Sequence, residues 1–386
     1  MDLDLSHPAL SDLRARCRRR LPGFVWEYLD SATGGQAAQR RNRAALDRVL
    51  LCPAALTGPV EADLSVDLFG QVQTLPVGIA PVGMSGMIWP GAEAALARLA
   101  ATTGIPYCLS TVATREPEEI GPLVSDRGWF QLYPPRDGEI RRDILRRARD
   151  AGFRVLVLTV DVPAPSRRER QRRARLTFPP QLTPKMLAQI ATSPAWALGT
   201  LRMGTPRLRM MEGYAVRVGR EAGGNAESTA HAGYLLRTAP DWDYLAALRR
   251  EWDGPLVVKG VLDPDAAARL PETGCDAVWV SNHAGRQFEG APAAIAALPA
   301  IRAAVGTAYP VLFDSGVEGG LDVLRAFALG ADFVFLGRAW HDALGAFGPR
   351  GAAHLVHILR EDLIANMAQI GIARPDEAGT RLFPQG

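Results

Sequence analysis

The chain has 386 residues, 47% of them hydrophobic and 22% charged, which is typical of a folded protein with a sizeable core and excludes a disordered chain. No apolar run approaches about 18 residues, so we expect no transmembrane helix, and the acidic first residues without an apolar segment argue against a secretory signal. The net charge of +3 is too small to indicate a nucleic-acid partner. The four cysteines form no CxxC pair, which fits reduced thiols in the cytoplasm. The six histidines are scattered along the chain, so we expect no metal site.

The first 75 residues precede the earliest strand pattern of the chain. Segments such as "LPGFVWEYLDSATGG" (21–35) predict helices and a short cap. We therefore expect residues 1–75 to form an N-terminal helical cap on a single domain that spans 1–386.

Eight short apolar runs, each bounded by glycine, proline or polar residues, predict eight β-strands. They occupy 76–83, 106–111, 129–133, 155–161, 255–261, 277–283, 310–316 and 333–338. Segments with helical apolar spacing lie between most of them, and "GAEAALARLAATTG", "DILRRARDAG" and "GLDVLRAFALGA" each end at a glycine suited to a helix C-cap. Strands that are apolar on both faces and alternate with helices predict a closed parallel (β/α)₈ TIM barrel over 76–345, with C-terminal helices over 346–386. An open doubly wound sheet is the alternative, which such regular units disfavour.

The interval between the fourth and fifth predicted strands, 162–254, is far longer than an ordinary βα loop. Because it follows the C-terminal end of a strand, it lies on the catalytic face of a barrel. Its "PKMLAQIATSPAWALGTLRMGTPRLRMM" mixes Leu, Met, Ile and Trp with Lys and Arg and has no acid before Glu212. We expect an insertion over 164–240 and leave two interpretations open: a segment on an anionic membrane surface, or a mobile lid with a solvated basic face. Nucleic-acid binding is a third interpretation, which no interleaved aromatic residues support.

Polar side chains stand at the C-terminal ends of seven of the eight predicted strands, where a barrel carries its chemistry. The first strand ends instead in "APVG", a turn small enough to let a flat ring approach the backbone. The residues at the other strand ends include Ser110, Gln131, Tyr133, Thr159, Asp161, Lys259, His283, Arg286, Asp314, Gly337 and Arg338. Within "SNHAGRQFEG" (281–290), the histidine can take a proton and the arginine can bind a carboxylate. A ring of donors and acceptors around one cavity indicates an active site.

The last two predicted units have the features of a phosphate site. "DSGVEGG" (314–320) precedes a helix and "LGR" (336–338) ends the eighth strand, so glycine N–H groups, a helix N-terminus and an arginine meet there. A cofactor with a phosphate tail is implied. Gln131 and Thr159 can hydrogen-bond the polar edges of its ring, and Lys259 can stabilise negative charge on it.

The motifs "SNHAGRQ", "LVVKGVLDP", "WFQLY", "LTVDVP" and "DSGVEGGLDVLRAFALGADFVFLGR" resemble the FMN-dependent (S)-2-hydroxy acid dehydrogenase and oxidase family over nearly the whole chain. "EWDGPLVVKGVLDP", "MSGMIWPGAE" and "SPAWALGTLRMGTPRL" resemble its branch of bacterial quinone-linked L-lactate and (S)-mandelate dehydrogenases. The resemblance implies FMN as the cofactor, a small (S)-2-hydroxy acid as the substrate and a homotetramer.

The resemblance also implies a role for each site residue. His283 is the base that takes a proton from the α-carbon or the hydroxyl of the substrate, Asp161 stabilises its imidazolium, and Tyr133 lies beside the substrate hydroxyl. The implied substrate carboxylate contacts are Tyr28, Arg168 and Arg286. The implied flavin contacts are the backbone of Ala80, the side chains of Ser110, Gln131, Thr159, Lys259 and Asp314, and, at the phosphate, Gly337 and Arg338.

One residue departs from the family pattern. Glu318 stands where the family usually has an arginine that faces the FMN phosphate. A carboxylate would repel the phosphate by about 4 kcal/mol at about 4 Å and an effective dielectric constant of about 20. Either Glu318 points to solvent or the affinity for flavin is impaired, and the intact remaining flavin positions favour the first outcome.

The function expected from the sequence is FMN-dependent oxidation of an (S)-2-hydroxy acid to the 2-oxo acid, with electrons passed to quinone. We expect a cytoplasmic protein, with peripheral attachment to the inner face of the cell membrane through the insertion. An oxidase that passes electrons to oxygen and makes hydrogen peroxide is the close alternative, against which the insertion favours the dehydrogenase. A flavin-deficient barrel that acts as a binding protein is a second alternative.

Overall fold

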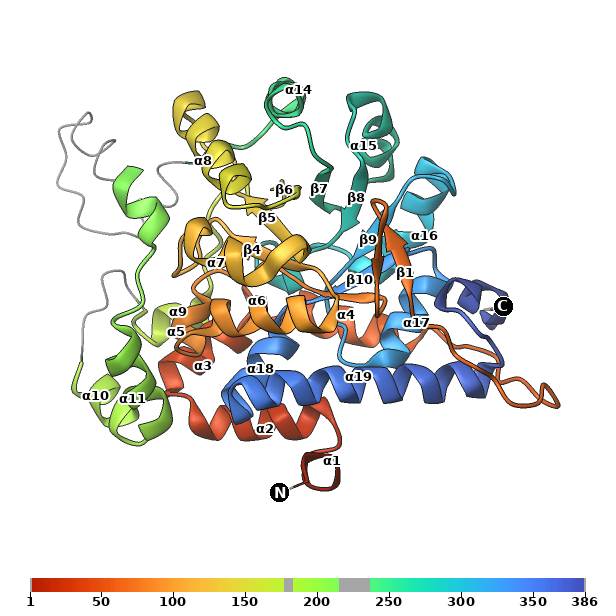
Figure 1. Cartoon of the computed structure of the whole chain (residues 1–386), viewed down its shortest axis with the longest axis horizontal. Helices are drawn as coiled ribbons and strands as arrows, with labels where there is room; N and C mark the ends of the chain where they lie inside the picture. Colours follow the sequence, from red (N-terminus) through yellow and green to blue (C-terminus); the bar gives the residue numbers. More distant parts are fainter. Residues whose placement is uncertain (1, 177–182, 215–236, 385–386) are drawn as a thin grey trace.

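The computed structural model describes residues 2–176, 183–214 and 237–384, and its centre is a closed barrel of parallel strands (Figure 1). Around the barrel the strands follow one another in chain order, and the last pairs with the first. They are β3 (Val77–Ile79), β4 (Tyr107–Ser110), β5 (Gly128–Leu132), β6 (Val155–Thr159), β7 (Leu256–Val261), β8 (Ala277–Val280), β9 (Val311–Phe313) and β10 (Phe333–Leu336). Each overlaps one predicted strand, so the predicted TIM barrel is confirmed.

Helices cover the outside of the barrel. They are α6 (Ala92–Thr103), α7 (Pro117–Val124), α8 (Gly138–Asp150), α14 (Trp242–Glu251), α15 (Pro264–Arg269), α16 (Ala294–Val305), α17 (Gly320–Ala328) and α18 (Arg338–Phe347). The three helices predicted to stop at glycine end one or two residues before Gly104, Gly152 and Gly330, whose φ values of 73°, 90° and 102° lie in the left-handed region. Glycine adopts this region without the steric cost of a Cβ atom, so the chain can turn from each helix toward the next strand.

The N-terminal segment contains the expected helices and, in addition, a hairpin that was not predicted. The helices are α1 (Leu3–Ser6), α2 (Leu10–Arg20), α3 (Gly23–Asp30) and α4 (Ala37–Asp47), and the hairpin pairs β1 (Val66–Leu68) with β2 (Gln71–Gln73). Phe69 and Gly70 form its turn with φ values of 56° and 70°, as a two-residue turn of this kind requires. Phe69 packs on Trp129 with ring centroids 5.7 Å apart, so the hairpin closes the N-terminal end of the barrel.

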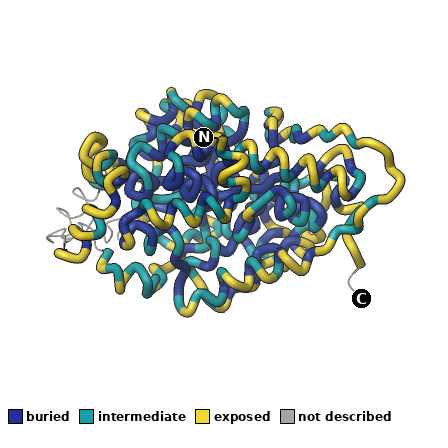
Figure 2. The backbone as a smooth tube through the Cα atoms, turned by 90° about the horizontal axis from the view of Figure 1, so that it is seen from below, coloured by how far each residue is buried: buried dark blue, intermediate teal, exposed yellow. Residues whose placement is uncertain are grey.

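The core lies inside and around the barrel, and buried segments gather in the centre of the tube in Figure 2. Trp279 stacks on Phe335 with centroids 4.1 Å apart, and Trp129 lies 5.1 Å from the same ring. These aromatic side chains fill the interior toward the hairpin. The polar residues therefore occupy the opposite end, at the C-terminal ends of the strands.

The long connection between β6 and β7 carries α9 (Glu169–Arg173), α10 (Pro184–Ala191) and α11 (Pro194–Met203). The last two helices lie at one end of the molecule beside α2 and α3 (Figure 1). Trp196 holds them there, because its ring packs edge-on against Phe24 and its indole N–H donates to the Met87 carbonyl at 2.9 Å. Residues 177–182 and 215–236 of the predicted insertion lie outside the described residues.

A long helix near the C-terminus, α19 (Pro349–Ile370), runs beside α2 and α18. A short helix, α5 (Ser85–Ile88), follows β3, and 3₁₀ segments stand at Ser125–Arg127, Pro271–Thr273, His283–Gly285 and Pro375–Arg381. Within the described ranges, no helix has both the length and the apolar character needed to cross a bilayer.

Candidate active site

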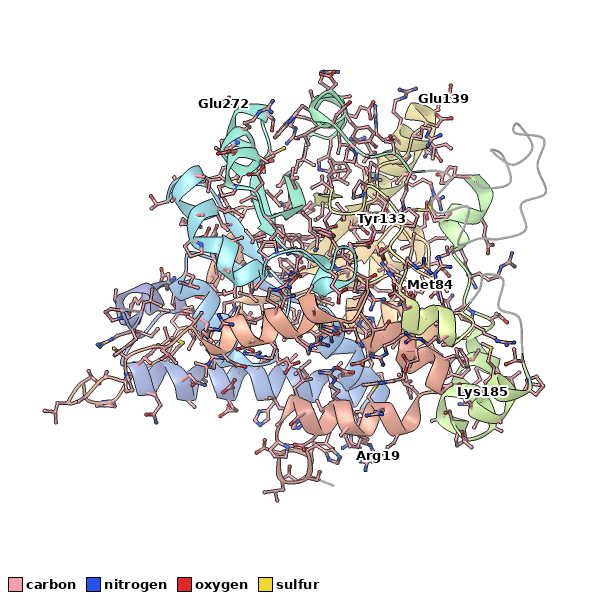
Figure 3. All side chains as sticks on the ribbon, turned by 180° about the vertical axis from the view of Figure 1, so that it is seen from behind. Arg19, Met84, Tyr133, Glu139, Lys185 and Glu272 are labelled. Carbon is pink, nitrogen blue, oxygen red and sulfur yellow. The ribbon has the colours of Figure 1, made fainter. Side chains whose placement is uncertain are left out.

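A cavity of about 850 Å³ opens at the C-terminal ends of the strands. Figure 3 labels two of its lining residues, Met84 and Tyr133. All of the predicted site residues except Ser110 and Asp161 line this cavity. Those that line it are Tyr28, Ala80, Gln131, Tyr133, Thr159, Arg168, Lys259, His283, Arg286, Asp314, Gly337 and Arg338.

His283 is presented to the cavity by a strained turn after β8. Both His283 and Ala284 have positive φ values, 55° and 54°, which non-glycine residues adopt at an energetic cost. The turn is held from outside: Ser315 Oγ accepts from the backbone N–H groups of Asn282 and Ala284 at 3.2 and 3.1 Å. Backbone strain that is fixed by surrounding bonds is common at functional sites.

His283 and Asp161 form a hydrogen-bonded pair, with His283 Nδ1 3.0 Å from Asp161 Oδ1. Burial lowers the pKa of His283, and Asp161 offsets only part of this effect, so the pKa lies below its ordinary value of 6.5. Burial opposes ionisation of Asp161, yet the pairing with His283 and the charge of Lys259 outweigh it and lower the pKa of the carboxyl. At neutral pH the pair is therefore a neutral imidazole backed by a carboxylate, which is a competent general base.

Lys259 lies buried at the end of β7 in a network of short bonds. Its Nζ is 2.8 Å from Asp314 Oδ2 and 2.8 Å from Ser281 Oγ, and Ser281 in turn donates to Asp314 at 2.5 Å. Burial disfavours the ammonium, but the Asp314 and Asp161 carboxylates outweigh it and raise the pKa of Lys259. Lys259 is therefore protonated at neutral pH and stands on the cavity floor in an ion pair with Asp314.

Arg286 and Arg168 place two guanidinium groups on the cavity wall. Arg286 donates to the backbone carbonyls of Tyr28, Leu29 and Ser31 at 2.9, 3.1 and 3.0 Å, which fixes the plane of its fork. Burial, followed by the charge of Arg168, lowers the pKa of Arg286 to about 9. The group is still protonated at neutral pH. Because its positive charge and that of Arg168 repel each other, an anion such as a carboxylate is favoured beside them.

The two tyrosines differ in how closely they follow the prediction. The Tyr28 hydroxyl faces the cavity but donates to the Gly83 carbonyl at 2.9 Å, so a substrate carboxylate would have to compete for its proton. Burial raises the pKa of Tyr133, which keeps that hydroxyl protonated. Arg237, which sequence reasoning did not single out, lies over the Tyr133 ring at 3.5 Å from its centroid.

Gln131 and its neighbours offer polar groups to a ring. Ser110 lies behind Gln131 and donates to its Oε1 at 2.9 Å. Gln131 Nε2 is buried and has no hydrogen-bond partner among the described residues. A buried donor without an acceptor is costly, so this amide fits a ligand that presents a carbonyl or ring nitrogen there.

Gly337 and Arg338 begin α18 at the far end of the cavity, where other charged residues gather that the sequence did not reveal. Arg14, Asp30 and Asp342 all line this end. Glu318 also lines it; its side chain is 50% exposed and pairs with Arg14 at 3.2 Å, so it is half turned to solvent rather than fully. Within the described residues no group of three or more His, Cys, Asp or Glu could hold a metal ion.

Comparison with known proteins gives a consistent result. A sequence model of the FMN-dependent dehydrogenases matches residues 17–384. An L-lactate dehydrogenase of Caulobacter vibrioides is 39% identical over 362 residues, 94% of each chain, and one of Pseudomonas aeruginosa is 37% identical over 364 residues, again 94% of each.

Solved structures agree. The monotopic membrane protein (S)-mandelate dehydrogenase superposes with a TM-score of 0.89 at 30% identity, covering 98% of this chain and 99% of its own. A mandelate oxidase bound to a 2-hydroxy acid superposes with a TM-score of 0.80 at 32% identity, again covering 98% and 99%.

Proposed function

The chain belongs to the family of FMN-dependent dehydrogenases, and we propose that it oxidises an (S)-2-hydroxy acid of the L-lactate or (S)-mandelate type to the 2-oxo acid. The observation that carries this proposal is a base beside a carboxylate site: His283, paired with Asp161, shares one cavity with Arg286 and Arg168. We further propose that residues 1–386 act as one catalytic domain, with 164–240 as the insertion over the site.

His283 takes the proton that the substrate loses, from the α-carbon in a carbanion route or from the hydroxyl in a hydride route. Its neutral form at pH 7 makes this transfer feasible. Asp161 holds Nδ1–H toward itself, which leaves Nε2 as the accepting atom and stabilises the imidazolium that forms. FMN, when bound, supplies the acceptor of the two electrons that leave the substrate.

Arg286 and Arg168 bind and orient the substrate carboxylate. Arg286 can do so without reorganisation, because three backbone carbonyls already fix its guanidinium. Tyr133 lies beside the substrate hydroxyl with its own proton retained, and Tyr28 adds a hydrogen bond to the carboxylate if it leaves the Gly83 carbonyl.

The cavity residues fit FMN. The buried Nε2 of Gln131 gains an acceptor in the flavin ring, and Ser110 orients that amide from behind. Lys259 supplies a positive charge where the reduced ring gathers negative charge. The full set that would hold the cofactor is Ala80 through its backbone, Ser110, Gln131, Thr159, Lys259, Asp314, Gly337 and Arg338.

Quinone is the proposed electron acceptor, and the surface of α10 and α11 supports it. Leu187, Leu198, Leu201 and Met203 are exposed on these two helices, Leu201 at 81%. Lys185 on α10 lies at the edge of the molecule (Figure 3), as expected of a basic residue facing anionic lipid. We propose that this surface attaches the protein to the inner face of the membrane, where quinone is dissolved.

Oxygen is the second candidate acceptor, because mandelate oxidase shares the fold. Anaerobically reduced protein mixed with either air or a soluble quinone separates the two. Reoxidation by quinone at a much higher rate than by air supports the dehydrogenase, and fast reoxidation by air with peroxide release supports the oxidase. A homotetramer, proposed by resemblance alone, is tested by sedimentation.

The proposed reaction is tested by steady-state assay of both enantiomers of lactate and mandelate with a dye acceptor. We expect turnover of the (S) forms only, and its loss in a His283→Gln variant that retains flavin. Equal turnover of the (R) forms, or full activity of the variant, would overturn the assignment.

A further inference from the structure

Glu318 places a carboxylate where a phosphate is expected to bind. It stands on the loop between β9 and α17, facing the same cavity end as Gly337 and Arg338. With the loop arginine of the family absent, Arg338 would be left to balance a phosphate dianion. The structure supplies a second cation from a different part of the chain.

That cation is Arg14, on the N-terminal helix α2. Its Nη1 lies 3.2 Å from Glu318 Oε1, and its Nη2 bonds the carboxylate of Asp30. Arg338 Nη1 donates to the backbone carbonyl of the same Asp30 at 3.3 Å. Both guanidinium groups therefore contact one residue, and both line the cavity.

Close packing fixes the position of α2. Leu10, Leu13 and Cys17 bury one face of the helix, and Cys17 packs where a Cβ on Gly345 of α18 would lie only 2.3 Å from its sulfur. Any larger residue at that glycine would push the helices apart. Arg14 lies next to this buried stripe, so its side chain is directed to the start of α18.

The charges at this end favour an anion. Asp30 is already shared between Arg14 and Arg170, whose Nη1 lies 2.8 Å from it. Burial raises the pKa of Asp342 to about 7, so this carboxyl is partly neutral at physiological pH. Burial, and after it the charge of Arg14, lowers the pKa of Arg338, and the carboxylates of Asp30, Asp342 and Glu318 offset only part of this effect. An anion between the two arginines would therefore stabilise the charge of Arg338 further.

We infer that Arg14 binds the FMN phosphate together with Arg338, taking the place of the loop arginine that Glu318 replaces. Glu318 then serves as the ion-pair partner that holds Arg14 across the cavity end. The inference rests on the proposed position of the phosphate at Gly337 and Arg338.

The test compares FMN with riboflavin, which has the same ring and lacks the phosphate. Both flavins are titrated into the flavin-free full chain by fluorescence, for the native protein and for Arg14→Gln, Arg338→Gln and Arg19→Gln. Arg19 is the matched control, because it carries the same charge on the outer side of α2 (Figure 3). The rate of FMN release from the diluted holoenzyme is a second readout.

We expect Arg14→Gln to weaken FMN binding by about 10- to 100-fold, the effect of losing one charge-assisted bond, and to leave riboflavin binding unchanged. Arg338→Gln should behave likewise and Arg19→Gln should alter neither. Adding Glu318→Arg to Arg14→Gln should restore the preference for FMN.

Three results would overturn the inference. Equal weakening of both flavins by Arg14→Gln would mean that Arg14 only supports the fold. A selective effect of Arg338→Gln without one of Arg14→Gln would leave the phosphate position intact and exclude Arg14. No selective effect of either would mean that the phosphate binds elsewhere, and the proposed cofactor placement would fail with it.

Discussion

Replacement of Asp161 by asparagine isolates the electrostatic contribution of the carboxylate to the base. The variant keeps the shape of the side chain that lies 3.0 Å from His283 Nδ1 and removes its charge. Two unit charges about 4 Å apart attract by about 4 kcal/mol at an effective dielectric constant of about 20. Because only part of the imidazolium charge has developed in the transition state, we expect kcat to fall by about 10²-fold.

The same variant should alter the pH profile in a defined direction. The base must be neutral, so activity is lost as the pH falls through the pKa of His283. Asp161 raises that pKa against the larger effect of burial, and its removal should move the acid limb of kcat/KM to lower pH. Asp150→Asn, on the outer surface of α8, is the matched control. A kcat within threefold of native, or an acid limb that moves to higher pH, would exclude this role of Asp161.

Three further predictions concern Arg286, the buried carboxyl of Asp342 and the exposed leucines of α11. Arg286→Lys cannot reproduce a fork held by three carbonyls, so kcat/KM for the hydroxy acid should fall by about 10²-fold or more in steady-state assays; a change below fivefold contradicts this. Burial raises the pKa of Asp342 from 3.8 to about 7. Ionisation of this carboxyl therefore disfavours the folded state, and the free energy of unfolding of the flavin-free chain should fall as the pH rises from 4 through 7. The free energy of unfolding in urea of Asp342→Asn, relative to the native protein, should therefore increase over this pH range toward a difference of about 4 kcal/mol. A difference that does not change with pH would contradict this prediction. Leu198→Asp with Leu201→Asp should abolish sedimentation with anionic vesicles and leave turnover of a soluble acceptor unchanged; retained vesicle binding excludes this surface.

The strands and their polar ends were predictable because each depends on local sequence. Runs such as "VLVLTVD" are apolar on both faces, which only a strand covered on both sides tolerates. The C-terminal ends of the strands necessarily meet at one end of a parallel barrel. The sequence alone therefore predicted that His283, Arg286 and Lys259 lie close together.

The contacts that the sequence did not reveal join distant segments. The pairing of Arg14 with Asp30 and Glu318 crosses from α2 to the loop before α17, and no local periodicity encodes it. Arginine is so abundant in this chain that one more in "LRARCRRR" carries no signal. The hairpin at Phe69 was missed for a related reason: its strands are only three residues long, too short for an alternating pattern.

The most direct test of the central claim is the visible absorption spectrum of the purified protein under anaerobic conditions, before and after addition of L-lactate or (S)-mandelate. We expect flavin bands that bleach with at least one of these (S) acids and persist with the (R) enantiomer. A protein that carries FMN and bleaches with neither (S) acid, or one that stays colourless after incubation with FMN, would contradict it.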